Sequence, residues 1–599
     1  MAFAALEAVQ LYGAVSDLRG GATELQASLT QLGTTPGNWT PAGVKAATAT
    51  RASAQSRLDR ANRRLQSDPL LKVLGHLPYA RDQVRAVWDL SSAVEEAGVS
   101  EGDLLTVAGL YTSRPQGSAD PGATLITLLK RASPSLADAD GRLTLANQRL
   151  GQDSKLQLAA PIRTEIDRAI ARITPALITA HDGSQAAQLL PGLLGAVGPK
   201  TYLVLLANPS ELRPSGGFAG EVGTATFSGG RLTKLELQNE FVVSQQYREK
   251  FPPQGQEGNF LLFQNNQLEI GDAGWDPDFP TSAHLQERMY TSATGQKLDG
   301  TISIDPYVIS SLLKITGPVS VPGYGSFDTN NFFLRTNVIA NVDTSPSGGK
   351  NALQPIAIAI IAKVFASPSS NWVAIGTAFL DAADQRHLQV SVDNPTPEAI
   401  LHGQNIDGSI VTTPLTEDYL LIAEANVSAT KADNYIQRSV QVKVEIYPSG
   451  LNRHEVDIHY DYPPPKDATD DALNRSALNP TSIYRDYVRF YLPLTATLGN
   501  IGFEEDGKPA PAYGGGLREQ GVEASKQVYG TFFTLPRGHS ADLIIYYEVG
   551  LPAASPFQLY VQKQAGLPEL PIDLEVSYPG GIAKRSSTVA RDEIFTINW

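Results

Sequence analysis

Helical periodicity covers the first third of the chain. Apolar residues recur three or four positions apart in five segments, with charged residues between them and Gly or Pro at the breaks. The segments are 4–32, 41–67, 80–97, 135–150 and 161–173. This spacing places the apolar side chains on one face of each helix. We therefore expect residues 1–195 to form a helical bundle, which is compatible with a stalk that carries the rest of the protein.

Strand-like and helical segments alternate from about residue 200 to residue 430. The expected strands are 201–207, 221–228, 231–238, 299–304, 319–321 and 387–393, and the expected helices are 306–315, 352–366 and 370–384. The polar segment 239–298 has few regular signals, so we interpret it as a long loop ordered by its aromatic residues. We expect residues 196–432 to form a mixed α/β domain that carries a catalytic site.

Strict alternation of apolar and polar positions marks the last part of the chain. Examples are VQVKVEI, DYVRFYLPL and ADLIIYYEVG, with Pro or Gly between the segments. This pattern predicts an immunoglobulin-like β-sandwich over residues 433–599, an accessory domain with a structural or glycan-contacting role. The whole chain is thus expected to be a multidomain α+β protein.

Composition excludes several kinds of chemistry. The chain has no cysteine, which rules out thiol catalysis, disulfides and Cys-ligated metals, and its 8 His show no metal-binding spacing. We expect no metal and no cofactor. A net charge of −14 argues against nucleic acid as a partner, because backbone binding needs a basic surface. A weakly charged ligand such as a glycan remains compatible.

The sequence contains no apolar stretch long enough to cross a membrane. It opens directly in helical pattern, without the charged region or cleavage site of a signal peptide. Our hypothesis is that a membrane anchor upstream of this segment has been removed, and that the membrane is a partner only through that anchor. The oligomeric state is left open.

A polar turn follows the apolar strand at 202–206. From Asn208 to Phe218 it reads Asn-Pro-Ser-Glu-Leu-Arg-Pro-Ser-Gly-Gly-Phe. Polar groups at the end of a core strand are a common place for a binding site. Gly216 and Gly217 let the backbone approach a ligand closely. We expect these glycines, Asn208 and Arg213 to bind the substrate.

Several motifs in order resemble the domain-of-unknown-function family 4012, found mainly in actinobacteria and related envelope-rich bacteria. They are ANPSELRPSGGF, DPDFPTSA, LDGTISIDPYVISSLLKITGPVSVPGYG and KADNYIQRSVQV, starting at residues 207, 276, 298 and 431. The central strand–Asp-Pro–helix–Gly-Pro-Val segment is also distantly similar to the LytR-CpsA-Psr phosphotransferases, which attach glycopolymers to cell walls. The resemblance implies an extracytoplasmic, membrane-anchored protein that acts on a cell-envelope polysaccharide.

The supply of charged residues departs from the phosphotransferase pattern. Between 200 and 330 the arginines are Arg213, Arg231, Arg248 and Arg288, too few for the guanidinium clamp that a pyrophosphate requires. Carboxylates are abundant. The leading hypothesis is therefore a glycoside hydrolase or transglycosylase, with arabinan as a candidate substrate. The alternatives are a magnesium-dependent phosphotransferase with a lipid tunnel, and a non-enzymatic envelope scaffold.

Glycosidic chemistry needs two carboxyl groups and an aromatic platform for the sugar. The candidates for acid and base are Glu211, Glu221, Asp272 and Asp278. Trp275 would support the sugar, and Asp305 would help to bind it. Three of these residues have a structural alternative: Glu211 as an ion pair with Arg213, Glu221 as a surface strand residue, and Asp305 as a helix cap before Pro306.

Overall fold

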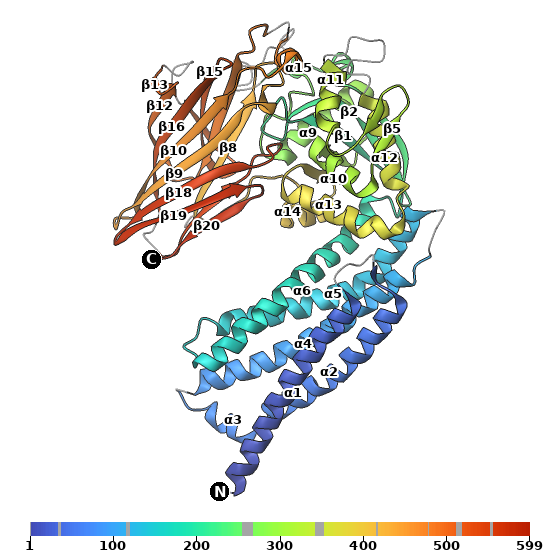
Figure 1. The fold of residues 1–599 in the computed structure, drawn as a ribbon, viewed down its shortest axis with the longest axis vertical. Helices are drawn as coiled ribbons and strands as arrows, with labels where there is room; N and C mark the ends of the chain where they lie inside the picture. Colours follow the sequence, from blue (N-terminus) through green and yellow to red (C-terminus); the bar gives the residue numbers. More distant parts are fainter. Residues whose placement is uncertain are drawn as a thin grey trace. The chain divides into compact units, whose positions relative to one another are not determined.

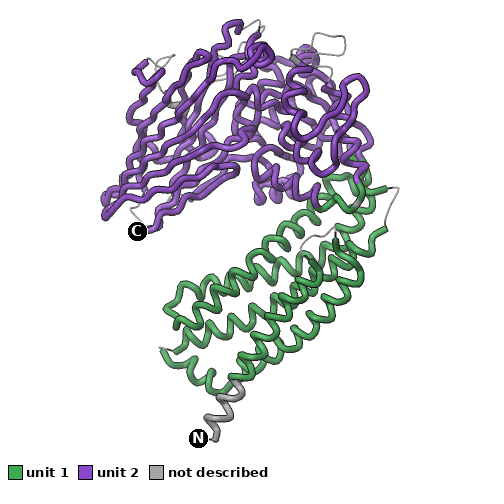
Figure 2. The backbone as a smooth tube through the Cα atoms, viewed as in Figure 1, with its two compact units in different colours: residues 1–199, 227–231, 368–373 green, residues 200–226, 232–367, 374–599 purple. Residues whose placement is uncertain are grey.

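The computed structural model describes most of the chain. The described residues are 2–33, 38–78, 80–115, 120–253, 267–341, 353–414, 417–476, 479–510, 518–551 and 555–599. Two compact units result (Figure 2). The first contains residues 1–199, 227–231 and 368–373, and the second contains all others.

The first unit is helical, as the periodicity predicts (Figure 1). Its helices are α1 (Ala2–Leu32), α2 (Pro41–Ser67), α3 (Pro69–Leu74), α4 (Arg81–Thr112), α5 (Pro121–Asp153) and α6 (Ala160–Leu193). Helices α4, α5 and α6 are longer than expected. In α5 and α6 the reason is that Pro134, Pro175 and Pro191, which predict helix ends, lie inside the helices. Helix α4 continues past Gly98, where the expected helix ended. No helix among the described residues is long and apolar enough to cross a membrane.

The second unit contains a five-stranded sheet in the order β3-β2-β1-β4-β7. Its strands are β1 (Lys200–Asn208), β2 (Phe218–Ser228), β3 (Arg231–Asn239), β4 (Gly300–Ile304) and β7 (Leu388–Val392). β1 and β4 are parallel, whereas β4 and β7 are antiparallel, so the sheet is mixed. All five strands lie where the sequence predicts them.

Helices and a small hairpin surround this sheet. They are α7 (Glu240–Ser244), α9 (Phe279–Thr294), α10 (Pro306–Thr316), β5 (Val319–Val321), β6 (Gly325–Phe327), α11 (Phe332–Asn341), α12 (Leu353–Phe365), α13 (Trp372–Asp384) and α14 (Pro395–Gly403). The short helix η3 (Ser369–Asn371) belongs to the first unit. The expectation of a loop across 239–298 is wrong for α9. This helix has a Pro in its first turn and ends at Gly295 with φ of 77°. Phe260 and Phe263, two of the aromatics in that prediction, lie outside the described residues.

The rest of the second unit is rich in strands. A seven-stranded sheet has the order β13-β12-β16-β10-β9-β18-β19, and a six-stranded sheet has the order β14-β15-β11-β8-β17-β20. The elements are β8 (Asp418–Asn426), η4 (Ala432–Asn434), β9 (Gln437–Ile446), β10 (Leu451–Tyr462), α15 (Ala468–Leu473), β11 (Tyr484–Leu492), β12 (Thr497–Glu505), β13 (Lys508–Pro509), β14 (Arg518–Glu523), β15 (Lys526–Leu535), β16 (His539–Gly550), β17 (Phe557–Gln562), β18 (Leu570–Tyr578), β19 (Gly581–Val589) and β20 (Glu593–Ile597).

One apolar core lies between these two sheets. It includes Val440, Val442 and Val444 of the larger sheet and Leu420 and Phe490 of the smaller one. Because β8 belongs to the smaller sheet, this two-sheet region begins at residue 418, ahead of the boundary expected at 433. The parallel pairs β17–β8 and β18–β9 also depart from the all-antiparallel pattern of an immunoglobulin domain.

A second apolar core joins the five-stranded sheet to the two-sheet region. It combines Leu203 and Leu205 of β1 with Ala425 of β8 and Tyr487 of β11. The polar turn between β1 and β2 therefore starts from a strand whose Leu203 and Leu205 pack against the two-sheet region. This packing brings the turn close to β8 and β11.

Candidate functional site

The polar turn begins at the end of β1 and returns to β2. Its backbone closes on itself, because Phe218 N donates to Glu211 O at 2.8 Å. Gly216 and Gly217 have φ of 124° and 146°. A Cβ at position 217 would lie 2.5 Å from backbone atoms of Asn208. The fold of the turn by itself thus requires glycine at 217.

Arg213 makes the central contacts of the turn. Its side chain is 6% exposed, and Nε and Nη2 donate to Asp272 Oδ1 at 3.0 and 2.5 Å. Nη1 donates to the carbonyls of Leu212 and Asn426 at 3.0 and 2.6 Å. The guanidinium carbon also lies 5.5 Å from the Phe218 ring centre. The buried charge is therefore compensated by groups of the protein itself.

Glu211 pairs with a lysine from a distant segment. Its Oε1 lies 3.0 Å from Lys431 Nζ, and the two side chains are 15% and 8% exposed. The ion pair with Arg213 that we considered does not form, because Arg213 bonds to Asp272 instead. Glu211 and Arg213 thus each hold a different segment against the turn.

Asn208 begins a chain of amide and hydroxyl hydrogen bonds. Asn208 Nδ2 donates to Asn337 Oδ1 at 2.9 Å, and Asn337 Nδ2 donates to Ser210 Oγ at 3.2 Å. Ser210 Oγ in turn donates to Asn434 Oδ1 at 2.9 Å. The chain connects the turn to α11 and to η4.

Two glutamines hold the backbone of the turn from its other side. Gln389 Nε2, on β7, donates to Ser215 O at 2.8 Å. Gln564 Nε2 donates to Arg213 O at 3.4 Å. Backbone carbonyls that accept such bonds need no ligand to satisfy them. The turn is therefore bonded to β7 and to the segment after β17.

Two other expected site residues lie in the core. Glu221 on β2 is 1% exposed, so the interpretation as a surface strand residue is wrong. Trp275 is 6% exposed, and its ring stacks on Tyr487 with centroids 5.6 Å apart. Arg489 lies 5.3 Å from the Trp275 ring centre and donates to its carbonyl. In this structure the indole is a core ring and offers no open face to a sugar.

Asp276 and Asp278 precede α9. Asp276 Oδ1 accepts from Asp278 N at 2.9 Å, so Asp276 braces the turn before the helix. Asp278 accepts from Ile410 N at 3.1 Å and from Thr281 Oγ1 at 2.7 Å. Burial raises the pKa of Asp276 to about 6, although the positive charge of Arg489 opposes this rise.

Asp305 caps α10, which confirms the structural alternative for this residue. Its Oδ1 accepts from Tyr307 N at 2.8 Å, and its Oδ2 lies 2.6 Å from His387 Nδ1. His387 is therefore a bonded structural histidine. Beside them, burial lowers the pKa of Lys563 to about 7, and the negative charge of Asp305 acts in the opposite direction.

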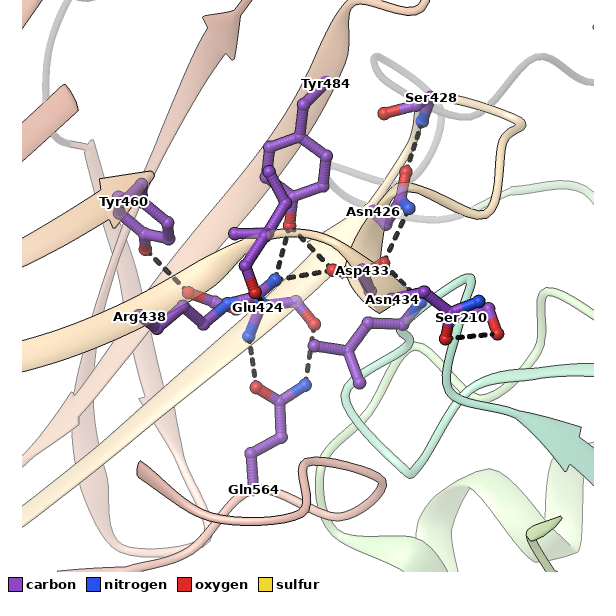
Figure 3. A network of polar contacts seen from close by, with 12 residues as sticks. Ser210, Glu424, Asn426, Ser428, Asp433, Asn434, Arg438, Tyr460, Tyr484 and Gln564 are labelled. Atoms are coloured by element: carbon purple, nitrogen blue, oxygen red, sulfur yellow. Dashed lines mark hydrogen bonds and ion pairs between the residues drawn. The ribbon is translucent and has the colours of Figure 1, made fainter. Parts of the chain in front are cut away.

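A second polar network surrounds Arg438 of β9 (Figure 3). Arg438 Nε lies 2.5 Å from Glu424 Oε2, and Nη2 lies 2.5 Å from Asp433 Oδ1. Tyr460 Oη donates to Glu424 Oε1 at 2.6 Å, and Tyr484 Oη donates to Asp433 Oδ1 at 3.0 Å. Both carboxylates and the guanidinium are almost completely buried. The network lies between the two sheets.

This network is continuous with the polar turn. Asp433 Oδ2 accepts from Leu212 N at 2.9 Å and from Asn426 Nδ2 at 2.6 Å. The carbonyl of Asn426 accepts from Arg213. The charged groups of the turn and those between the sheets are therefore parts of one hydrogen-bonded system.

Burial sets the protonation of the network. It raises the pKa of Glu424, with Arg438 acting in the opposite direction. Burial also raises the pKa of Asp486 well above its ordinary value, and the charge of Glu424 adds to this rise. Glu424 and Asp486 share the positive charge of one guanidinium, that of Arg438, an arrangement that favours retention of a proton by this pair.

The space beside this network is small. A cavity of about 20 Å³ is lined by Glu424, Arg438, Lys563 and apolar side chains of both sheets. This volume suits about one water molecule and not a sugar. Among the residues that the structure describes, no group of His, Asp and Glu has the arrangement to hold a metal ion.

The sequence carried one signal for the Arg438 network that we missed. Val440, Val442 and Val444 of β9 point into the core, and Arg438 has the same parity. A charged residue at an inward position of an alternating strand implies a buried partner. Its partners, Asp433 and Glu424, come from other segments, so the sequence could not identify them.

Gly217 provides a test of the turn. We expect Gly217→Ala to lower the free energy of unfolding by about 1–3 kcal/mol, because the new Cβ clashes with backbone at a positive φ. Gly220→Ala on β2 is the control, since a Cβ there meets nothing closer than 3.7 Å. Denaturant unfolding measures both variants. Equal stability of the two would contradict the account.

Substituting Asn for Asp276 and for Asp272 should change the free energy of unfolding in opposite directions. The folded-state pKa of Asp276 is raised from 3.8 to about 6, so its ionisation removes stability as the pH rises through that window. We expect Asp276→Asn to match the natural chain near pH 4 and to exceed it by about 2–3 kcal/mol at pH 7.5.

Asp272→Asn should instead destabilise the protein at pH 7.5 by about 3–5 kcal/mol, because it leaves the buried Arg213 without a counter-charge. Both variants are compared by unfolding across the pH range. An Asp276→Asn protein that is less stable than the natural chain at pH 7.5 would refute the assignment.

Comparison with known proteins gives one family match. Residues 197–337, which include the polar turn, match the model of the family described as "Protein of unknown function (DUF4012)". A comparison with curated proteins found no match.

Two solved structures share partial likeness at 10% identity. A nutrient-binding protein from Legionella pneumophila aligns over 30% of this chain and 66% of its own length, with a TM-score of 0.18. An M1 zinc metallopeptidase mutant from Deinococcus radiodurans aligns over 26% and 39%, with a TM-score of 0.14. The chain thus spans less than two thirds of each, and these scores carry no argument about fold or function. The match over residues 197–337 supports the resemblance to the DUF4012 family that the sequence motifs suggest.

Proposed function

We propose that this chain is a non-enzymatic scaffold protein of the bacterial cell envelope. The observation that carries the proposal is that the polar turn is bonded internally. Arg213 bonds to Asp272, Glu211 pairs with Lys431, and further side chains hold the backbone. These groups connect parts of one folded unit.

The requirements of a glycosidase also favour a scaffold over an enzyme. Such an enzyme needs two carboxyl groups that reach opposite sides of a glycosidic bond. Glu211 and Asp272 are 15% and 13% exposed, and each is held by a cation of the protein. To act on a sugar, either carboxylate would first have to leave a mostly buried ion pair, which is costly.

The outward face of the seven-stranded sheet is the surface that we assign to the polysaccharide. On β10 the inward residues are buried, whereas Arg453 and His459 are exposed. Tyr546 of β16 is 39% exposed on the same face, directly opposite Glu455. A sheet face with aromatic and hydrogen-bonding side chains suits a polysaccharide chain.

The cellular location, the domain types and the candidate ligand are part of the same proposal. We place the protein outside the cytoplasm of an actinobacterium, anchored in the membrane, with a LytR-CpsA-Psr-like central domain, an immunoglobulin-like end and arabinan as a candidate ligand. The motif resemblance described above supports this placement. The phosphotransferase alternative is weakened because Arg213, the arginine of the turn, is already paired.

A glycoside hydrolase or transglycosylase is the second candidate. It is favoured by Asp276, whose pKa of about 6 is typical of a catalytic acid, next to Asp278. Glu211, Glu221, Asp272 and Asp278 stay its predicted catalytic carboxyl groups.

An assay separates these candidates. The purified chain is incubated with arabinan, galactan or mannan, and the products are analysed. We expect no product, because the carboxyl groups of the turn are held in ion pairs. Product formation that is lost in Glu211→Gln or Asp278→Asn, but not in the exposed control Glu236→Gln, would replace the scaffold by the enzyme.

Binding tests the scaffold itself. Co-sedimentation with insoluble wall polysaccharide should retain the natural chain, and Tyr546→Ala should weaken retention about ten-fold by removing an aromatic contact. Leu494→Ala is the control, since Leu494 is 44% exposed and lies after β11 of the other sheet. Retention that is equal in both variants would contradict the assigned surface.

A further inference from the structure

We propose that one end of the helical unit, formed by α3 and the loop between α5 and α6, binds an anionic lipid surface. We name it the α3 end and define it as residues 68–78, 80–82 and 154–161. The proposal is independent of the scaffold function. It also differs from the expectation that the membrane is contacted only through an upstream anchor.

Helix α3 is apolar but contributes nothing to the core. Its sequence is Pro-Leu-Leu-Lys-Val-Leu, and none of these residues is buried. Leu70 is 42% exposed and Val73 is 63% exposed. The helix is nevertheless well formed, because Asp68 Oδ1 accepts from Leu71 N at 2.9 Å at its start. A short rigid helix thus presents apolar side chains to the outside.

Basic residues surround this apolar helix. Lys72 is exposed in its middle, and Arg81 at the start of α4 is 69% exposed. Lys155 is exposed in the loop between α5 and α6. Of the acids in this region, Asp68 is 5% exposed, whereas Asp82 is 41% exposed and lies 3.4 Å from Arg81 Nε. One exposed carboxylate thus stands against the three exposed basic side chains.

The loop that holds Lys155 is bonded to the start of α4. Gln83 Nε2 donates to Gln157 O at 2.9 Å, and Ala159 N donates to Gln83 Oε1 at 2.9 Å. The basic groups therefore belong to one end of the unit. A basic end on a chain with a net charge of −14 is a departure from the average surface and complements an anionic lipid layer.

A second copy of the chain is a poorer occupant. In a two-fold dimer the α3 end would face itself, and its exposed Lys72, Arg81 and Lys155 would repel their counterparts. Anionic headgroups attract these residues, while the interfacial layer accepts Leu70 and Val73. Both kinds of side chain are then satisfied together.

Vesicle co-sedimentation tests the proposal with the full chain. The natural chain should pellet with vesicles of phosphatidylglycerol and phosphatidylcholine and much less with phosphatidylcholine alone. Leu70→Asp with Val73→Asp should reduce the bound fraction about ten-fold, and Lys72→Glu with Lys155→Glu should remove the preference for anionic vesicles.

The control is Leu145→Asp with Ile178→Asp. Both residues are 55% exposed and lie on α5 and α6, outside the α3 end, so binding should not change. Circular dichroism and thermal unfolding check that every variant is folded, and the lysine variants, whose side chains are exposed, keep the test valid if the aspartate variants unfold.

Three results would overturn the proposal. The first is that the natural chain stays in the supernatant with anionic vesicles. The second is that the α3-end variants pellet as well as the natural chain. The third is that light scattering finds a dimer of the natural chain that the α3-end variants abolish, which would assign the α3 end to a second copy.

Discussion

The buried guanidinium of Arg213 is the constraint on which the second unit depends. A charge that is 6% exposed has lost most of its contact with water, so the fold must supply acceptors for its donors. It supplies Asp272, a carbonyl of the turn and the carbonyl of Asn426 at the end of β8. Three segments far apart in the sequence must therefore meet at one guanidinium. This requirement fixes the position of the turn relative to Asp272 and to the end of β8.

The same principle extends to the neighbouring network. Arg438 is compensated by Glu424 and Asp433, and Asp433 accepts from the backbone of the turn. Such buried ion pairs add little net stability compared with apolar packing, but breaking one is costly. These ion pairs therefore mainly determine which arrangement of the segments is the folded one, because any other arrangement leaves a buried charge without its partner.

Much of the fold could be predicted from the sequence, because periodicity reports burial. β1, β4 and α10 lie within about two residues of their predicted bounds, since each has a clear period and a clear end signal. Helix α9 was missed because its apolar face is interrupted by polar residues such as Gln286, which the fold buries. Pro134 and Pro175 predict helix ends, but both lie inside long helices, because packing between the helices outweighs the low helix propensity of proline.

The candidate site was predictable in its membership but not in its partners. Asn208, Arg213 and Gly217 do cluster at the turn, and Asp272 does reach it. Sequence separation gives no information on which carboxylate meets which cation, so Lys431 as the partner of Glu211 was not foreseen. Nor does it distinguish an exposed indole from a core one, and Trp275 lies in the core because Tyr487 packs on it.

The most direct test of the account is a double-mutant cycle between Arg213 and Asp272. The free energy of unfolding is measured for Arg213→Met, Asp272→Leu and the double variant. The account predicts a coupling energy of about 2 kcal/mol or more, because each single variant leaves one buried charge without its partner. Additive effects within about 0.5 kcal/mol would contradict it, since the two groups would then act independently.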